Sequence, residues 1–177
     1  MDKEQYSLLQ KAYNGKRVFL TGHTGFKGSW MLTWLNILGA NVRGYSLAPE
    51  VSHALFNELR GTDLCESVIA DVRNQDRLIK EIQEFKPDFI FHLAAQPLVR
   101  LSYEMPIETF DTNIMGSAHV LNAIRHLGTA CVTLIITTDK VYENREWVYP
   151  YREDDPLGGY DPYSASKAAA EIVCSSF

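Results

Sequence analysis

Short apolar runs alternate along the chain with segments whose apolar residues recur every three or four positions. The runs are typical of buried strands, and the segments are typical of helices with one face on a core. The expected strands cover 17–21, 41–46, 67–70, 89–92 and 131–137, and the expected helices cover 25–38, 74–85, 106–127 and 163–174. Residues 141–159 are expected to form a long loop, because aromatic, acidic, Pro and Gly residues dominate them.

This alternation predicts βαβ units, and therefore an α/β domain with a parallel sheet and helices on both of its faces. The length of 177 residues suits one domain with its own core. We expect 1–15 to be an N-terminal extension and 16–177 to form the domain.

Composition narrows the possible partners. The chain is 46% hydrophobic and 22% charged, with a formal net charge of −5. An acidic chain argues against a nucleic-acid partner, and no apolar run approaches the roughly 18 residues of a membrane helix. Three dispersed cysteines without a CxxC motif, and five histidines without ligand spacing, predict reduced thiols and no metal site. We therefore expect a cytoplasmic protein.

Three glycines lie between the first strand and the first helix with the spacing GxxGxxG, at Gly22, Gly25 and Gly28. The first permits a tight turn, the second lets the backbone approach a pyrophosphate at the helix N-terminus, and the third allows close helix–strand packing. The strand–turn–helix context predicts a dinucleotide site. The other loop residues expected to contact the cofactor are Thr24, Phe26 and Lys27.

The choice between NAD and NADP stays open at this stage. A dinucleotide site usually has an acid at the end of the second strand, which contacts the ribose. No acid stands there in this chain, and Arg43 is nearby. Asp71, at the end of the third strand, is expected either to meet the adenine or to cap the following helix.

Tyr163 and Lys167 are four residues apart on the last expected helix, so they share one face of it. A phenol has a pKa of about 10 and is a poor base at neutral pH. A neighbouring ammonium would stabilise the phenolate and lower that pKa. The pair thus predicts a general acid/base that moves a hydroxyl proton.

Together these patterns resemble the extended short-chain dehydrogenase/reductase superfamily over nearly the whole chain. The segments that carry the resemblance are 21–28, 71–72, 92–96, Asn113, 137–138 and 163–167. The resemblance implies a Rossmann-type, doubly wound parallel sheet. It implies cofactor contacts from Asp71, Val72, Leu93, Ala94, Ala95, Asn113, Tyr163 and Lys167. It implies substrate contacts from Gln96, Arg100 and Thr138, with Thr138 bonding the reacting hydroxyl and Lys167 holding the nicotinamide ribose.

Asp139 and Lys140 follow Thr138 directly. By chemistry alone they are equally a solvated strand end or part of a site. The sequence is similar to the sugar-nucleotide 4,6-dehydratases, which carry Asp-Glu after this threonine, and the branch that acts on CDP-glucose has Lys in place of the Glu. The resemblance implies that Tyr163 takes the C4 hydroxyl proton, that Lys140 removes the C5 proton, and that Asp139 protonates the departing C6 hydroxyl.

Other functions stay open. A sugar-nucleotide epimerase or reductase would share the glycine loop and Tyr163, but would not need Asp139 and Lys140. A redox-sensing NAD(P)-binding module would need no proton-transfer group at all. Chains of the family are about twice as long as this one, so we expect it to lack the substrate-binding part. The resemblance also implies a homodimer.

Overall fold

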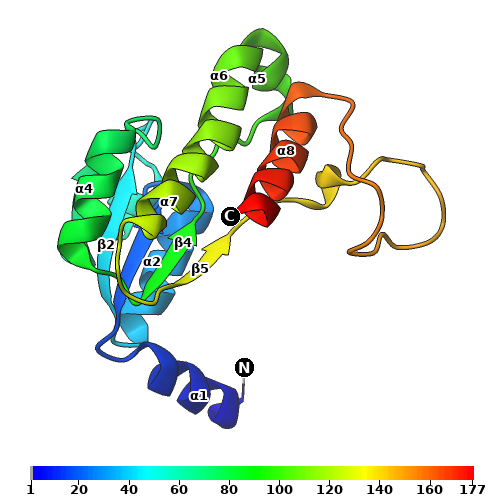
Figure 1. Cartoon of the computed structure of the whole chain (residues 1–177). Helices are drawn as coiled ribbons and strands as arrows, with labels where there is room; N and C mark the ends of the chain where they lie inside the picture. Colours follow the sequence, from blue (N-terminus) through cyan, green and yellow to red (C-terminus); the bar gives the residue numbers. More distant parts are fainter. Residues whose placement is uncertain (1) are drawn as a thin grey trace.

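A single parallel sheet organises the computed structural model, which describes residues 2–177 (Figure 1). The strand order is β3-β2-β1-β4-β5. The strands are β1 (Arg17–Thr21), β2 (Asn41–Ser46), β3 (Glu66–Ile69), β4 (Phe89–His92) and β5 (Val132–Ile135). Every neighbouring pair is parallel. The predicted Rossmann-type sheet is thus confirmed.

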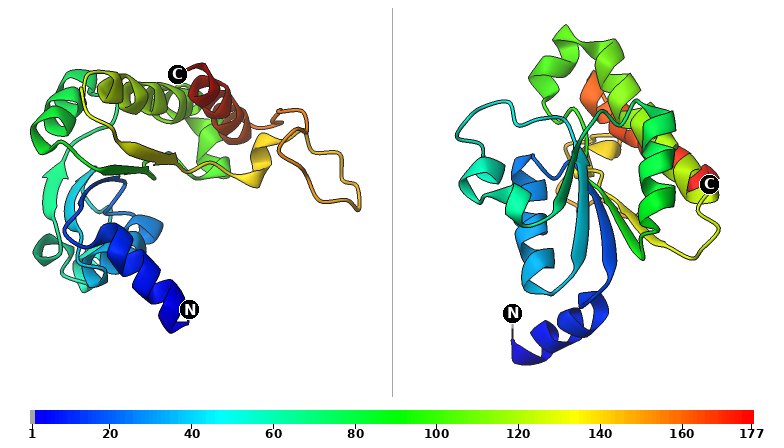
Figure 2. Two further views of the ribbon diagram at one scale, coloured as in Figure 1. Left: turned by 60° about the horizontal axis from the view of Figure 1, so that its bottom comes forward. Right: turned by 90° about the vertical axis from the view of Figure 1, so that its left-hand side faces the viewer.

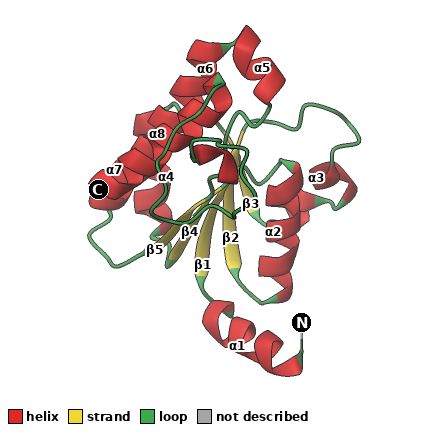
Figure 3. Ribbon diagram, turned by 90° about the vertical axis from the view of Figure 1, so that its right-hand side faces the viewer, coloured by secondary structure: helices red, strands yellow, loops and turns green. Residues whose placement is uncertain are grey.

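Helices cover both faces of this sheet. Figure 3 shows α2 and α3 on one side and α4, α7 and α8 on the other. The helices are α1 (Lys3–Tyr13), α2 (Phe26–Ile37), α3 (Leu55–Glu58), α4 (Gln75–Phe85), α5 (Val99–Glu104), α6 (Pro106–Phe110), α7 (Gly116–Arg125) and α8 (Pro162–Ser176). Three single turns complete the secondary structure: η1 (Gly61–Asp63), η2 (Asp111–Met115) and η3 (Asp139–Val141).

The core forms two layers, because the side chains of β1 point alternately to opposite faces. Val18 and Leu20 pack with Leu35 of α2, whereas Phe19 packs with Ile82 of α4 and other residues on the opposite face. A strand buried on both faces reads as one continuous apolar run, which is why this strand was recognisable in the sequence.

Five elements escaped prediction: α1, α3, η1, α5 and η3. Within the N-terminal extension, Asp2 and Gln5 form a capping box that starts α1. At its other end, the Tyr13 ring lies 5.0 Å from the Phe89 ring, between centroids. The extension therefore packs on the domain through an aromatic contact between residues distant in sequence, which no local sequence pattern predicts.

The helix expected over 106–127 is interrupted. Its middle is the π-turn η2, which contains the buried Asn113. The Asn113 side chain bonds the backbone of Gln96 and the hydroxyl of Ser166. A π-turn carries one extra residue per turn and is common at functional sites. Here it directs a polar side chain inward, at a contact with residues distant in sequence.

The loop between η3 and α8 projects from the body of the domain (Figure 2). Tyr142 pairs with Leu157 at its base. Further out, the rings of Tyr142 and Tyr151 stack with centroids 5.6 Å apart. The predicted long loop is present, and its own aromatic side chains organise it.

Within residues 2–177, no helix combines the length and apolarity needed to cross a membrane. Over the same residues, no three His, Cys, Asp or Glu side chains are grouped so that they could hold a metal ion. Cys65, Cys131 and Cys174 are free and partly buried.

Two histidines lie inside the domain. His23 bonds Ser67 through Nε2 at 2.7 Å, and its ring meets the edge of Phe56. His92 lies between Thr21 and Ser117. Burial lowers the pKa of His23 to about 4. Burial, helped by the charge of Lys167, lowers the pKa of His92 to about 3. Both rings are therefore neutral in the folded chain at physiological pH.

These two histidines predict a loss of stability in acid. An unfolded histidine takes up a proton below its ordinary pKa of about 6.5, while the folded rings stay neutral. The two histidines cost no stability well above pH 6.5, where they are neutral in both the folded and the unfolded chain. Below pH 6.5 they lower the free energy of unfolding progressively as the pH drops toward 4. From pH 7 to pH 5 we expect these two histidines to lower the free energy of unfolding, measured with urea, by roughly 4 kcal/mol.

Replacing one ring tests the cause. His23→Gln should reduce the dependence of stability on pH by about half, because one of the two titrating groups is gone. His126→Gln, at an exposed position, is the matched control and should leave the dependence unchanged. Equal slopes in all three proteins would contradict this explanation.

Candidate active site

The carboxyl ends of β1 and β4 adjoin at the centre of the sheet, where the chain order reverses. Ligands of doubly wound sheets bind in the crevice at this point. The glycine loop leaves β1 here. Gly22 has a φ of +75°, and a β-carbon on it would lie 2.7 Å from the Ala94 nitrogen. A β-carbon on Gly28 would lie 1.9 Å from the Gly22 oxygen. Side chains are thus excluded from both positions.

The N-terminus of α2 is left open by this loop. Its N-cap, Gly25, provides no side-chain hydrogen bond, and no acidic residue stands in the first turn. The side chain of Phe26 is 71% exposed, and Lys27 is exposed as well. Amide donors at a helix end of positive dipole suit a phosphate. The residues present therefore fit the pyrophosphate of a dinucleotide.

The end of β2 is tied to the same loop by hydroxyl groups. The Thr24 hydroxyl lies 2.7 Å from that of Ser46 and donates to the Leu47 oxygen at 2.8 Å. Arg43 lies elsewhere: it pairs with Glu66 and Glu81 at 2.9 and 3.3 Å. Arg43, which left the choice between NAD and NADP open in the sequence, is thus part of an ion-pair network on the α4 side.

Asp71 does not cap the following helix. Asn74 is the N-cap of α4, and its side chain accepts from the Arg77 amide. Asp71 instead pairs with Arg73 at 2.6 Å, and this hydrogen bond lowers the pKa of Asp71. The alternative that Asp71 is a helix cap is therefore wrong, and its contact with adenine stays a prediction. Its neighbour Val72 is buried against α7.

The segment after β4 forms the far wall of the crevice. Leu93, Ala94 and Ala95 are partly exposed there. Gln96, expected at the substrate, has a side chain that donates to Thr109 at 2.8 Å and accepts from the Leu98 amide at 2.6 Å.

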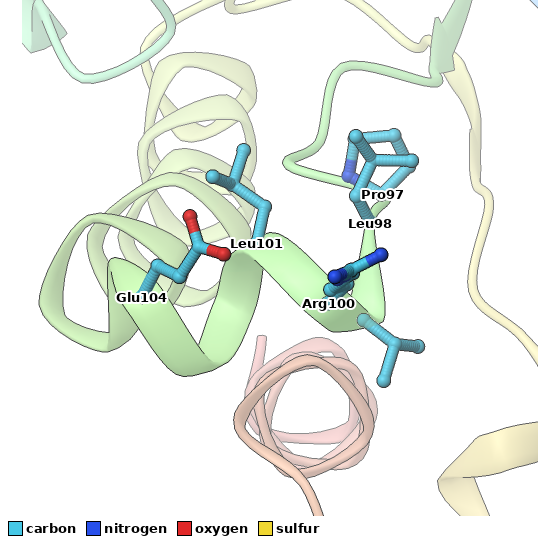
Figure 4. Close-up of a pocket in the computed structure, with 6 residues that line it drawn as sticks. Pro97, Leu98, Arg100, Leu101 and Glu104 are labelled. Atoms are coloured by element: carbon cyan, nitrogen blue, oxygen red, sulfur yellow. The ribbon is translucent and has the colours of Figure 1, made fainter.

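Asn113 has both amide hydrogens engaged within the protein, by the Gln96 oxygen and the Ser166 hydroxyl. Its direct contact with a cofactor stays a prediction. Arg100 is exposed on α5, next to an open hollow (Figure 4). The residues that line this hollow are Pro97, Leu98, Val99, Arg100, Leu101 and Glu104.

Tyr163 and Lys167 lie on α8, as predicted, but their electrostatics differ from the expectation. Burial raises the pKa of Tyr163, and the carboxylates of Asp139 and Asp161 add to the rise, whereas a hydrogen bond with Thr138 opposes it. Lys167 is 5% exposed, and its ammonium donates to the Ile136 oxygen at 2.8 Å. Burial lowers the pKa of Lys167 to about 8.

The prediction that Lys167 lowers the pKa of Tyr163 is therefore wrong for this chain. Residues four apart share a helix face, but the ammonium bonds a carbonyl at the end of β5 and does not set the pKa of the phenol. The structure does bring Thr138 and Tyr163 together, which the sequence could not establish by spacing.

Thr138 begins η3 and is its N-cap. Its hydroxyl donates to the Asp139 carboxylate at 3.0 Å. Asp139 and Lys140 are both exposed on this turn. One residue earlier, the Thr137 hydroxyl donates to Glu171 of α8. The acid, the base and the phenol therefore share one end of the sheet, and Glu171 links the strand exit to the helix that carries the phenol. Glu171 had no signal in the sequence analysis.

Comparison with known proteins agrees with this geometry. The sequence model of the family described as GDP-mannose 4,6 dehydratase matches residues 19–177. A CDP-glucose 4,6-dehydratase of Salmonella typhimurium is 55% identical over 165 residues, which is 93% of this chain and 46% of that protein. A UDP-glucose 4-epimerase of Mycolicibacterium smegmatis is 32% identical over 91% of this chain and 51% of that protein.

Solved structures agree as well. A UDP-glucose-4-epimerase from Stenotrophomonas maltophila, with bound NAD and formylated UDP-arabinopyranose, superposes with a TM-score of 0.80 at 26% identity. The match covers 91% of this chain and 48% of that one. The chain spans about half the length of the relatives it matches. By its sequence from β1 to the end of α8, and by its sheet, the chain belongs to the GDP-mannose 4,6 dehydratase family.

Proposed function

We propose that this chain is the cofactor-binding half of an enzyme that dehydrates CDP-glucose to CDP-4-keto-6-deoxyglucose. The observation that carries the proposal is the turn Thr138, Asp139 and Lys140 beside Tyr163, at the carboxyl end of β5. It places the carboxyl group of Asp139, the amino group of Lys140 and the phenol of Tyr163 next to the crevice of a dinucleotide-binding fold. The Salmonella relative, named as acting on CDP-glucose, supports the choice of substrate.

NAD is the proposed resident cofactor, and it would supply an acceptor that takes a hydride from the sugar and returns it. The open N-terminus of α2 would hold its pyrophosphate. NAD is favoured over NADP because the arginines near the ends of β2 and β3 are engaged by acids: Arg43 by Glu66 and Glu81, and Arg73 by Asp71 and Glu108. The NAD-bound epimerase of the same fold supports this choice.

The protein's own groups would carry the proton transfers. Tyr163 takes the proton of the C4 hydroxyl, and Thr138 orients that hydroxyl. Because burial and two carboxylates raise the pKa of Tyr163, the phenolate needs a positive charge brought near it. Lys167, four residues on along the same helix, would hold the nicotinamide ribose.

Asp139 and Lys140 would perform the elimination. The 4-keto group acidifies the C5 proton, Lys140 removes it, and Asp139 protonates the departing C6 hydroxyl, so that water leaves across C5–C6. Both side chains are exposed in this chain. A lysine acts as a base only when its pKa is lowered, so the bound sugar nucleotide and the surface around it would have to exclude water here.

The chain carries three free thiols, Cys65, Cys131 and Cys174. Free thiols are typical of reducing compartments. This supports a cytoplasmic location. The proposed binding partner is a nucleotide sugar.

We also infer a homodimer built on the helix series α6, η2 and α7 and on α8. Exposed apolar side chains on these elements are Ile107 of α6 (77%), Met115 of η2 (45%) and Ile172 of α8 (60%). Apolar surface of this kind is typical of protein–protein contacts. Sedimentation equilibrium should give twice the chain mass, and Ile107→Asp should shift the population toward monomer. A monomeric wild-type chain at high concentration would contradict the inference.

The cofactor site predicts direct NAD⁺ binding by the chain, measured by titration calorimetry. Gly28→Ala should weaken the affinity at least about tenfold, because the added carbon overlaps the Gly22 oxygen and moves the loop. Ala130→Val, at an exposed position after α7, is the control and should bind like the wild type. Thermal unfolding shows whether the variants are folded. Failure of the wild type to bind NAD⁺ would refute the proposed cofactor.

The catalytic assignment needs an enzyme with a complete substrate site. Because the chain spans about half of its relatives, the assay uses this chain joined after Phe177 to the second half of the Salmonella dehydratase. Lys140→Met should lower the formation of 4-keto product from CDP-glucose by about a thousandfold or more, with NAD⁺ affinity unchanged. Lys16→Met, an exposed lysine before β1, is the control. Wild-type turnover by Lys140→Met would end the assignment, and 4-epimer formation without a 4-keto product would favour an epimerase.

A further inference from the structure

The hydroxyl of Thr21, at the end of β1, has all its bonding positions used. It accepts from the Leu93 and Ala94 amides, both at 3.1 Å, and it lies 2.7 Å from Nδ1 of His92. A hydroxyl has two lone pairs and one hydrogen. Since the two amides take the lone pairs, the hydrogen points to His92. Nδ1 of His92 is then an acceptor, and the ring carries its proton on Nε2.

The second ring nitrogen of His92 continues the chain of bonds. Nε2 lies 3.2 Å from the Ser117 hydroxyl, which donates to the backbone oxygen of Asn113 at 2.7 Å. Ser117 therefore accepts from the imidazole and donates to the π-turn. The three side chains of Thr21, His92 and Ser117 are at most 1% exposed, so water does not compete for these bonds.

Asn113 closes the chain into a ring. Its side-chain oxygen accepts from the Gln96 amide at 2.8 Å, and its amide donates to the Gln96 oxygen at 3.1 Å. The segment from Ala94 to Gln96 then leads back to Thr21. A branch leaves the ring, since the Asn113 side chain also donates to Ser166 of α8 at 2.8 Å, and the Ser166 hydroxyl donates to the backbone oxygen of Tyr163 at 2.6 Å.

The ring thus holds the wall segment 93–96 at both ends. Thr21, next to the glycine loop, binds its first two amides, and Asn113, next to α8, binds its last residue. On one side the wall touches the glycine loop so closely that Gly22 has no room for a β-carbon. On the other side it is linked to the backbone of Tyr163. His92 and Ser117 connect the two clamps through hydrogen bonds of their side chains.

We propose that His92 is a positioning residue, which, as an Nε2-protonated neutral ring between Thr21 and Ser117, fixes the separation of the glycine loop from the helix that carries Tyr163. The inference rests on the proposed function in so far as the glycine loop binds NAD. Because its side chain is 1% exposed, His92 would touch neither the cofactor nor the substrate. It acts through the wall segment and the π-turn. The low pKa of His92, caused by burial and by Lys167, agrees with a ring that stays neutral.

The first test is spectroscopic and needs no ligand. Long-range ¹H–¹⁵N correlation spectra of the wild-type chain should show His92 protonated on Nε2, with Nδ1 unprotonated, at neutral pH. Thr21→Val should change this pattern, because Nδ1 loses its donor, and Thr21→Ser should restore it. A wild-type His92 with its proton on Nδ1, or a positively charged ring, would overturn the proposal.

The second test asks whether the two clamps are coupled. Ser117→Ala should speed hydrogen exchange of the Gln96 amide and weaken NAD⁺ binding by about tenfold, while Ser175→Ala, an exposed serine of α8, changes neither. The double variant Thr21→Val/Ser117→Ala should bind NAD⁺ no more weakly than whichever single variant binds it less tightly, because both substitutions break the same hydrogen-bonded ring. Additive losses, or unchanged affinity and exchange, would overturn the proposal.

The outcomes separate this inference from the proposed function. If the wild-type chain does not bind NAD⁺, the proposed cofactor fails. His92 is then judged by its tautomer and by the exchange of the Gln96 amide in Ser117→Ala, neither of which needs a ligand. If the wild type binds NAD⁺ and Ser117→Ala has the same affinity and the same Gln96 exchange, the positioning role fails and the cofactor site stands.

Discussion

The close approach of two loops at the centre of the sheet is the constraint on which this site depends. The glycine loop after β1 and the segment after β4 meet at Gly22 and Ala94, with no space for a β-carbon between them. The Thr21 hydroxyl stabilises the same contact by accepting hydrogen bonds from two backbone amides of the facing segment. Backbone on both sides, rather than side chains, therefore forms the floor of the crevice, and the N-terminus of α2 stays open above it.

A second consequence concerns polar groups in the interior. A buried histidine, serine and asparagine would destabilise the domain if their bonds were incomplete. Around His92 every donor has an acceptor, from Thr21 through Ser117 to Asn113. The π-turn in the long helix is part of this arrangement, because it brings Asn113 inward to Gln96 and Ser166. The same network that satisfies the interior also links the cofactor loop to the helix of Tyr163.

The groups proposed for chemistry differ in how far this chain prepares them. Lys167 is buried and bonded to the end of β5, and burial lowers its pKa to about 8. Asp139 and Lys140 remain exposed, and the pKa of Tyr163 is raised. A general acid or base works best when its pKa is near the working pH. Under the proposed function, these acid/base groups would depend on a bound sugar nucleotide and its surroundings for their final pKa values, whereas the glycine loop and the open N-terminus of α2 are already in place.

The sequence by itself determined the sheet and the location of the candidate site, because both follow from local patterns of residues. Buried parallel strands are continuous apolar runs, the glycine spacing admits only a tight strand–helix turn, and Tyr163 and Lys167 share a helix face by their separation. Tertiary structure alone decided what depends on contacts between distant segments. Arg43 lies in an ion-pair network, and Asp71 pairs with Arg73. Asn74 is the N-cap of α4, and the Lys167 ammonium bonds the Ile136 oxygen. Burial and the choice of partner set charge states, and neither is encoded within a few residues of the group concerned.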